Sequence, residues 1–366
     1  MLKIAIISVN YNRLHSLKRQ LISLENAFYP EEVTLIISID KSNTEEVENF
    51  ADEYVWKFGE KRVVKHEENL GLRNHMLSLG KYFDEFEALI ILEDDIIVAQ
   101  SYYLYAKACV EKYHDNDDIA GVSLYSLKHA LGNPVFLNDT VDGYDVYFIQ
   151  QAVSWGEVWM KRQWKEFKKW YDSIEKLQSE KIPNIVLGWS DKSWLKYHIT
   201  YCAEFEKYFV IPYKSLSTCY AEEGQHQTGK NFMSQVPLLN GIFGDFRLPN
   251  DKSQAICFDV FHEDERLYDI LGYTKQELML NLNCSLNNSK DFKYVLTPEH
   301  LNYKIVRSFA LELRPIQDNI IYNVEGRGIF LYDTSIFHRN KFSNADEHID
   351  YLIPHLMHIL KVEKGY

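Results

Sequence analysis

Three consecutive acids interrupt an apolar segment of the chain, ALIILEDDIIV at residues 88–98. Carboxylates such as Glu93, Asp94 and Asp95 are rarely buried unless they are paired or bound to a metal. Adjacent acids at the end of a strand repel one another unless a cation neutralises them, and their oxygens suit Mg²⁺ and Mn²⁺. The segment therefore predicts a divalent metal site. An acidic turn that faces solvent is the alternative.

The elements that must position these acids alternate between strand and helix over the first ninety residues. Helical stripes separate the expected strands, which lie at residues 4–9, 33–39, 62–65 and 88–92. Such alternation implies a mainly parallel sheet, whose ligands bind at the carboxyl ends of the strands. Asn10, Asp40 and the three acids follow such ends, so we expect them along one crevice.

The remainder of the chain is expected to contain a second domain. The polar segment 247–254 predicts a boundary, which gives domains at residues 1–250 and 251–366. In the second domain, Thr274 and Glu277 form the pattern of a capping box that starts a helix. Residues 319–334 are interpreted as a β-hairpin. We expect an α+β accessory region that binds an acceptor or mediates assembly.

Composition excludes several classes of function. The net charge is −13, which argues against a nucleic-acid groove. The five cysteines form no CxxC pair, which favours a reducing compartment over a disulfide framework. No segment reaches the roughly 18 uncharged apolar residues of a membrane span. We expect a cytoplasmic protein, with peripheral association at the inner membrane face left open.

Phosphate-binding loops of the common kinds are missing from the sequence. There is no GxxxxGK[ST] segment, and no GxGxxG follows the first expected strand. The pattern therefore weighs against a P-loop or dinucleotide fold. A metal held by Asp95 is the economical way for an acidic protein to neutralise a nucleotide diphosphate.

The order of several short segments resembles the GT-A fold glycosyltransferases over residues 1–245. These segments are NYNR, SID, NLGLRN, ILEDDIIV, SWGEVW and WSDKSW. The likeness is to the N-acetylglucosaminyltransferase I type, where the motif reads Glu-Asp-Asp, and to bacterial surface-polysaccharide glycosyltransferases. The resemblance implies a Rossmann-like GT-A catalytic domain of α/β class with Mn²⁺ or Mg²⁺. It also implies a nucleotide-diphosphate sugar, such as UDP-GlcNAc, and a glycan or lipid-linked acceptor.

Carried onto this sequence, the resemblance assigns a role to individual residues. Asp95 is the metal ligand and Asp191 the general base of an inverting transfer, with Glu157 the next catalytic candidate. The residues expected to bind the nucleotide-sugar donor are Ser8, Asn10, Arg13, Asp40, Asn69, Gly71, Arg73, Glu93, Asp94, Trp155 and His226. Simpler interpretations stay open: a turn or helix cap for Asp40, a helix cap for Asp191, a surface salt bridge for Arg73, and core packing for Trp155.

Two other functions remain as alternatives to glycosyl transfer. A nucleotidyltransferase that makes the sugar nucleotide has a similar sheet, but its class usually carries a Gly-rich basic loop that NYNRLHS lacks. A non-catalytic glycan-binding protein on the same fold is the other. The sequence also leaves a homodimer open.

Overall fold

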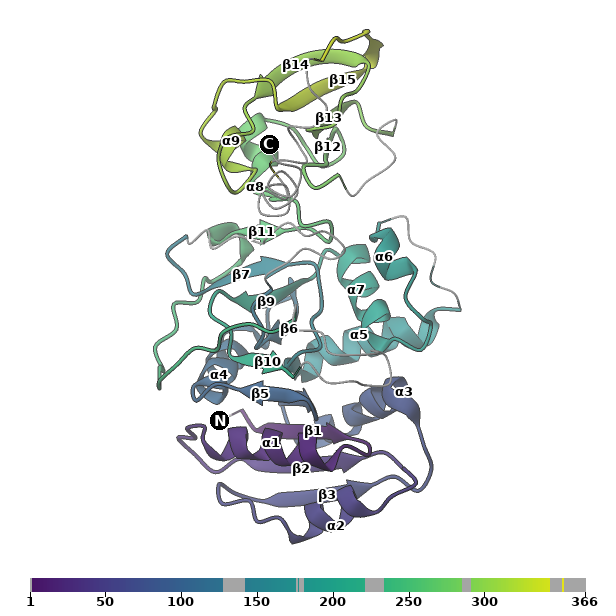
Figure 1. Cartoon of the computed structure of the whole chain (residues 1–366), viewed down its shortest axis with the longest axis vertical. Coiled ribbons are helices and arrows are strands. Elements are labelled where there is room, and N and C mark those ends of the chain that lie inside the picture. The colour runs from purple at the N-terminus through teal and green to yellow at the C-terminus, as the bar shows by residue number, and fades with distance from the viewer. Residues whose placement is uncertain are drawn as a thin grey trace, which may run out of the picture. The chain divides into compact units, whose positions relative to one another are not determined.

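The computed structural model describes residues 2–127, 142–175, 177, 181–220, 234–284, 291–342 and 351. It contains two compact units, which are described separately (Figure 1). The first unit comprises Met1–Ser126, Val141–Ile182 and Val186–Ala255. The second comprises Leu127–Thr140, Pro183–Ile185 and Ile256–Tyr366.

The first unit begins with parallel strands in the order β3-β2-β1-β4. The strands are β1 (Ile4–Asn10), β2 (Thr34–Ile39), β3 (Lys61–Lys65) and β4 (Ala88–Glu93). Between them come α1 (Leu14–Glu25), α2 (Glu46–Glu53), α3 (Gly71–Ser78) and the 3₁₀ helix η1 (Leu79–Asp84). The central strands are apolar and buried along their length, as parallel strands covered on both faces must be. The predicted strand and helix alternation is confirmed.

The sheet continues beyond β4 with strands of mixed direction. β8 (Glu157–Met160) runs antiparallel to both β4 and β6 (Ile119–Ser123). β9 (Tyr208–Pro212) is parallel to β6, and β7 (Val146–Ile149) is antiparallel to β9. The helices here are α4 (Tyr102–Tyr113), α5 (Lys161–Ser173), α6 (Asn184–Leu187) and α7 (Trp194–Glu204). The α/β class and the mainly parallel sheet are confirmed.

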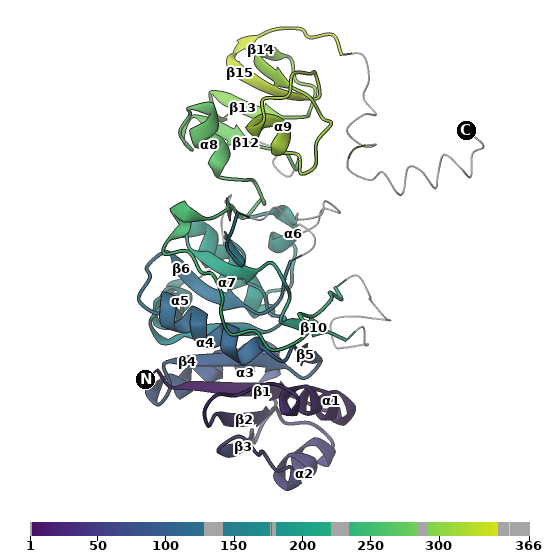
Figure 2. The same cartoon turned by 90° about the vertical axis from the view of Figure 1, so that its left-hand side faces the viewer.

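A two-stranded sheet carries the segment that follows the acids. β5 (Ile96–Val98) pairs antiparallel with β10 (Ser217–Cys219). The amide of Tyr220, just after β10, donates to the carbonyl of Asp95 at 3.0 Å. The acidic turn is therefore held between β4 and β5, with β10 alongside (Figure 2).

Aromatic side chains fill much of the space between the sheet and α5 and α7. The Trp159 and Trp164 rings stack with centroids 4.0 Å apart, and Trp194 packs edge-on against Trp159. A Cβ atom on Gly80, in η1, would overlap the Trp164 indole, so this close approach requires glycine. Core packing thus accounts for part of the aromatic surplus.

The second unit is an α+β arrangement. Its sheet order is β12-β13-β15-β14, with β12 (Leu278–Leu280), β13 (Tyr294–Thr297), β14 (Tyr303–Phe309) and β15 (Ile329–Phe337). Its helices are α8 (Arg266–Leu271) and α9 (Asp318–Ile321), and it also holds the short strand β11 (Cys257–Phe258). Leucine and isoleucine side chains form its core.

Two local predictions in this unit are wrong. Thr274 Oγ1 donates to Glu277 Oε2 at 2.8 Å, but strand β12 follows because Leu278–Leu280 pair with β13. The expected hairpin at 319–334 is instead the end of α9 followed by β15, which pairs with β13 and β14. In both cases pairing with distant segments overrode the local pattern.

Candidate active site

The polar residues at the strand ends meet at one edge of the sheet. Asn10 lies opposite Ile39, and the amide of Asp40 donates to the Asn10 carbonyl at 2.9 Å. On the other side of β1, Val9 lies opposite Glu93. Asn10, Asp40 and the acids therefore lie at one edge of the sheet, and the expected crevice there stays a prediction.

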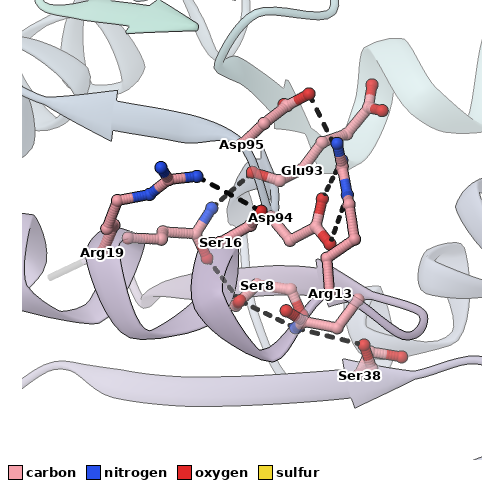
Figure 3. A network of polar contacts seen from close by, with 10 residues as sticks. Ser8, Arg13, Ser16, Arg19, Ser38, Glu93, Asp94 and Asp95 are labelled. Carbon is pink, nitrogen blue, oxygen red and sulfur yellow. Dashed lines mark hydrogen bonds and ion pairs between the residues drawn. The ribbon is translucent and has the colours of Figure 1, made fainter. Parts of the chain in front are cut away.

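Arg13 is a cation that contacts Asp94 and Asp95 directly (Figure 3). It occupies the N-cap position of α1, and its guanidinium donates to both oxygens of Asp94, with Nε 3.2 Å from Oδ2. The same group lies 3.3 Å from Asp95 Oδ2. Burial alone would lower the pKa of Arg13, but the charges and hydrogen bonds of Asp94, then of Asp95, raise it. An arginine therefore does part of the neutralising that the sequence assigned to a metal.

The three acidic groups lie close enough to affect one another's ionisation. Burial, followed by the charges of Asp95 and Asp94, raises the pKa of Glu93 to about 8. The metal-binding role of these acids stays a prediction. The Asp95 side chain is 26% exposed and that of Asp94 only 6%, so the Asp95 carboxylate is the more accessible of the two. The described part of the chain holds no group of three or more His, Cys, Asp or Glu arranged for a metal ion.

Ser8 and Asn10 lie beneath the acids. The Ser8 hydroxyl is fully buried, donates to Gln20 Oε1 and accepts from Asn10 Nδ2 at 2.9 Å. The structure therefore does not favour a contact between Ser8 and the nucleotide-sugar donor. Asn10 is also buried, yet its Oδ1 has no hydrogen-bond partner among the described residues. An unpaired buried hydrogen-bond acceptor costs free energy. The contact of Asn10 with the nucleotide-sugar donor therefore stays a prediction.

Asp40 has a structural task at the start of α3. Its Oδ1 accepts from the amide of Leu70 at 2.8 Å, and its Oδ2 accepts from that of Gly71 at 2.9 Å. Gly71 has a positive φ of 71°, and Asn69 Nδ2 donates to the carbonyl of Lys41. The capping alternative for Asp40 is thus observed. The contacts of Asp40, Asn69 and Gly71 with the nucleotide-sugar donor stay predictions.

Arg73 joins α3 to the segment that carries Asp191. Its Nη1 donates to the Asp191 carbonyl at 2.5 Å, and its guanidinium lies 5.8 Å from the centre of the Tyr197 ring. The helix-cap alternative for Asp191 is wrong, because Ser193 Oγ accepts from the amide of Lys196 at the start of α7. The Asp191 side chain is 87% exposed, and its role as the general base stays a prediction.

Glu157 lies in the core instead of at the surface. It is fully buried on β8, with Oε1 3.2 Å from Nδ1 of His198 on α7 in a contact without hydrogen-bond alignment. Burial raises the pKa of Glu157, and His198 opposes that rise. A carboxylate with no access to solvent does not reach an acceptor hydroxyl, so the structure does not favour Glu157 as the base.

His198, Gln20 and Lys196 are important residues that the sequence analysis missed. Only the helical spacing of Trp194 and His198 signalled that His198 faces the core. Trp155 is half-buried, with its ring centre 4.7 Å from that of Tyr125, and its donor role stays a prediction. His226 lies outside the described residues.

Comparison with known proteins gives a likeness of general fold. No family model and no curated protein matches the chain. Among solved structures it is similar to S. aureus TarS 1–349 in complex with UDP-GlcNAc, at 15% identity and a TM-score of 0.41, over 62% of this chain and 60% of that one. It therefore covers less than two thirds of the TarS fragment.

Two further solved structures show weaker or shorter likeness. GalNAc-T7 with UDP, GalNAc and Mn²⁺ has 15% identity and a TM-score of 0.41, over 58% of this chain and 43% of that one. The mannosyltransferase PcManGT from Pyrobaculum calidifontis, in complex with GDP-Man and Mn²⁺, has 12% identity and a TM-score of 0.32 over 46% of each chain. Separately, the helices in the described ranges are all too short or too polar to cross a membrane.

Proposed function

We propose that this chain is a metal-dependent, inverting glycosyltransferase that moves a sugar from a nucleotide-diphosphate donor to a glycan or lipid-linked acceptor. The donor is a UDP-sugar, with UDP-GlcNAc the first to test, and the setting is bacterial polysaccharide synthesis. The observation that carries the proposal is the placement of two separate acidic sites on one unit. The Glu93–Asp95 turn ends β4, and the exposed Asp191 is attached through Arg73 to α3, which begins beside Asp40.

Each acidic site suits a different half of a displacement reaction. Asp191 would accept the proton of the acceptor hydroxyl as it attacks the sugar, which is the task of a general base. Asp95 would hold the metal, and a bound divalent cation supplies charge neutralisation for the departing diphosphate. Asn10 Oδ1 and Arg73 would contact the nucleotide. The second unit would bind the acceptor or mediate assembly.

A panel of nucleotide sugars, incubated with the protein and Mn²⁺, tests this proposal. We expect hydrolysis or transfer with one nucleotide series, and loss of that activity in Asp95→Asn. Asp172→Asn is the matched control, because Asp172 is an exposed acid on α5 that pairs with Lys168. Release of pyrophosphate from a nucleoside triphosphate would instead indicate a nucleotidyltransferase. Glycan binding without turnover of any donor would indicate a binding protein.

A further inference from the structure

Gln20 is a fully buried polar residue in the middle of α1. Buried amides are expected to be hydrogen-bonded at both ends, since an unpaired group there costs about 1–3 kcal/mol. Its two amide atoms do have partners on different strands. Nε2 donates to the main-chain carbonyl of Glu93, and Oε1 accepts from the Ser8 hydroxyl.

These bonds belong to a continuous network under the acidic turn (Figure 3). Asn10 Nδ2 donates to Ser8 Oγ at 2.9 Å, Ser8 donates to Gln20, and Gln20 donates to Glu93. Glu93 is the last residue of β4, so its carbonyl is the point from which the chain turns into Asp94 and Asp95.

The same helix also contacts the side chains of the turn. Gln20 follows Arg13 by seven residues, about two helical turns, so both residues lie on the same face of α1. Arg13 binds the carboxylates of Asp94 and Asp95, and Gln20 binds the main chain of Glu93. The turn is thereby fixed at both its backbone and its charged groups.

We infer that Gln20 is a positioning residue for the acidic turn: it fixes the Glu93 carbonyl and so directs Asp95 toward the metal and the donor diphosphate. Gln20 itself contacts neither of these. Groups that orient a metal ligand commonly change metal affinity by on the order of 10–100-fold when they are removed. The role of Asp95 rests on the proposed function, whereas the effect of Gln20 on the turn does not.

Gln20→Met tests this inference, because methionine has a similar length and makes neither hydrogen bond. The matched control is Ser23→Ala on the same helix. Ser23 Oγ accepts from the Val98 amide at 3.3 Å, so it ties α1 to β5 without touching the Glu93 carbonyl. The first measurement is amide hydrogen exchange at Asp94 and Asp95 in the protein without metal or nucleotide. The second is the Mn²⁺ concentration that half-saturates binding in the presence of UDP.

We expect faster exchange at Asp94 and Asp95 in Gln20→Met only, with a rise on the order of tenfold in half-saturating Mn²⁺. In the turnover assay, the half-saturating concentrations of the metal and of the nucleotide-sugar donor should change more than kcat. Unchanged exchange at both aspartates would overturn the positioning role. If the wild-type protein bound no Mn²⁺ in the presence of UDP, faster exchange in Gln20→Met would still confirm that Gln20 orders the turn. That result would contradict both the proposed function and the metal-directing part of the inference.

Discussion

Lys196 and Asp191 form an ion pair in which one partner is buried and the other is exposed. Lys196 Nζ lies 3.0 Å from Asp191 Oδ1, and the two side chains are 6% and 87% exposed. The ammonium also donates to the carbonyl of Trp189 at 2.9 Å. Because a buried ammonium needs a compensating charge, we expect Lys196 to hold the Asp191 carboxylate in place. Lys196 would thereby orient the proposed base.

Lys196→Met should therefore lower turnover without removing the base itself. We expect a smaller loss of kcat than in Asp191→Asn, for which loss of a general base predicts a decrease on the order of 10²–10⁴-fold. Nucleotide binding should be unchanged in both variants, because neither residue is placed at the donor. The measurements are kcat with the active donor and a thermal shift with UDP. Wild-type turnover in Lys196→Met would contradict the orienting role.

The buried pair of Glu157 and His198 predicts coupled effects on stability. Glu157→Leu and His198→Leu should each cost about 3 kcal/mol, because either change leaves a buried polar partner uncompensated. The double variant should cost less than the sum of the two, because it leaves no such partner behind. Urea unfolding of the wild type and the three variants measures these free energies. Additive losses would show that the contact at 3.2 Å contributes no coupling.

Glu263 in the second unit predicts a dependence of stability on pH. Burial first, and then the charge of Asp259, raises the pKa of Glu263 to about 8. Between its unfolded pKa of about 4.3 and this value, the folded state binds a proton that the unfolded state has lost. The free energy of unfolding should therefore fall as the pH rises from 5 to about 8, by at most about 1.4 kcal/mol per pH unit for this group.

Glu263→Gln should flatten that slope, because glutamine does not ionise. The exposed Glu312→Gln, in the same unit, is the control and should keep the wild-type slope. Urea unfolding at several pH values between 5 and 8 gives the comparison. Equal slopes in all three proteins would mean that Glu263 is charged in the folded state.

The sequence correctly predicted the positions of residues that depend on the local pattern of strands and helices. The strand ends that place Asn10, Asp40 and Glu93 on one edge follow from apolar periodicity and from the geometry of parallel strands. The contact between Arg13 and Asp94 was not predicted, because the two residues are 81 positions apart and only the tertiary fold brings them together. His198 was missed for the same reason.

Burial also separated residues that look alike in the sequence. Glu157 and Asp191 both stand near tryptophans, yet one is in the core and the other is open to solvent. A pattern of residue types does not show which side of a strand or loop faces a neighbouring helix. The sheet register decides it for Glu157, which lies opposite Ile91, and local loop structure decides it for Asp191.

Arg13→Met should make the stability of the protein more dependent on metal. Asp94 would lose both its hydrogen bonds to the guanidinium, and breaking a buried ion pair predicts a loss of about 3 kcal/mol without metal. A divalent cation at the acids would replace part of the missing charge. Because a ligand that binds only the folded state stabilises it, Mn²⁺ should raise Tm more in Arg13→Met than in the wild type.

The control for this experiment is Arg162→Met, which removes a surface ion pair with the exposed Asp117. Its Tm should change little, and its response to Mn²⁺ should match that of the wild type, because exposed pairs contribute about 0–1 kcal/mol. Differential scanning fluorimetry with and without Mn²⁺, and with Mg²⁺ for comparison, measures both responses. If Mn²⁺ raised Tm equally in all three proteins, Arg13 and the metal would not share the carboxylates of the Glu93–Asp95 turn.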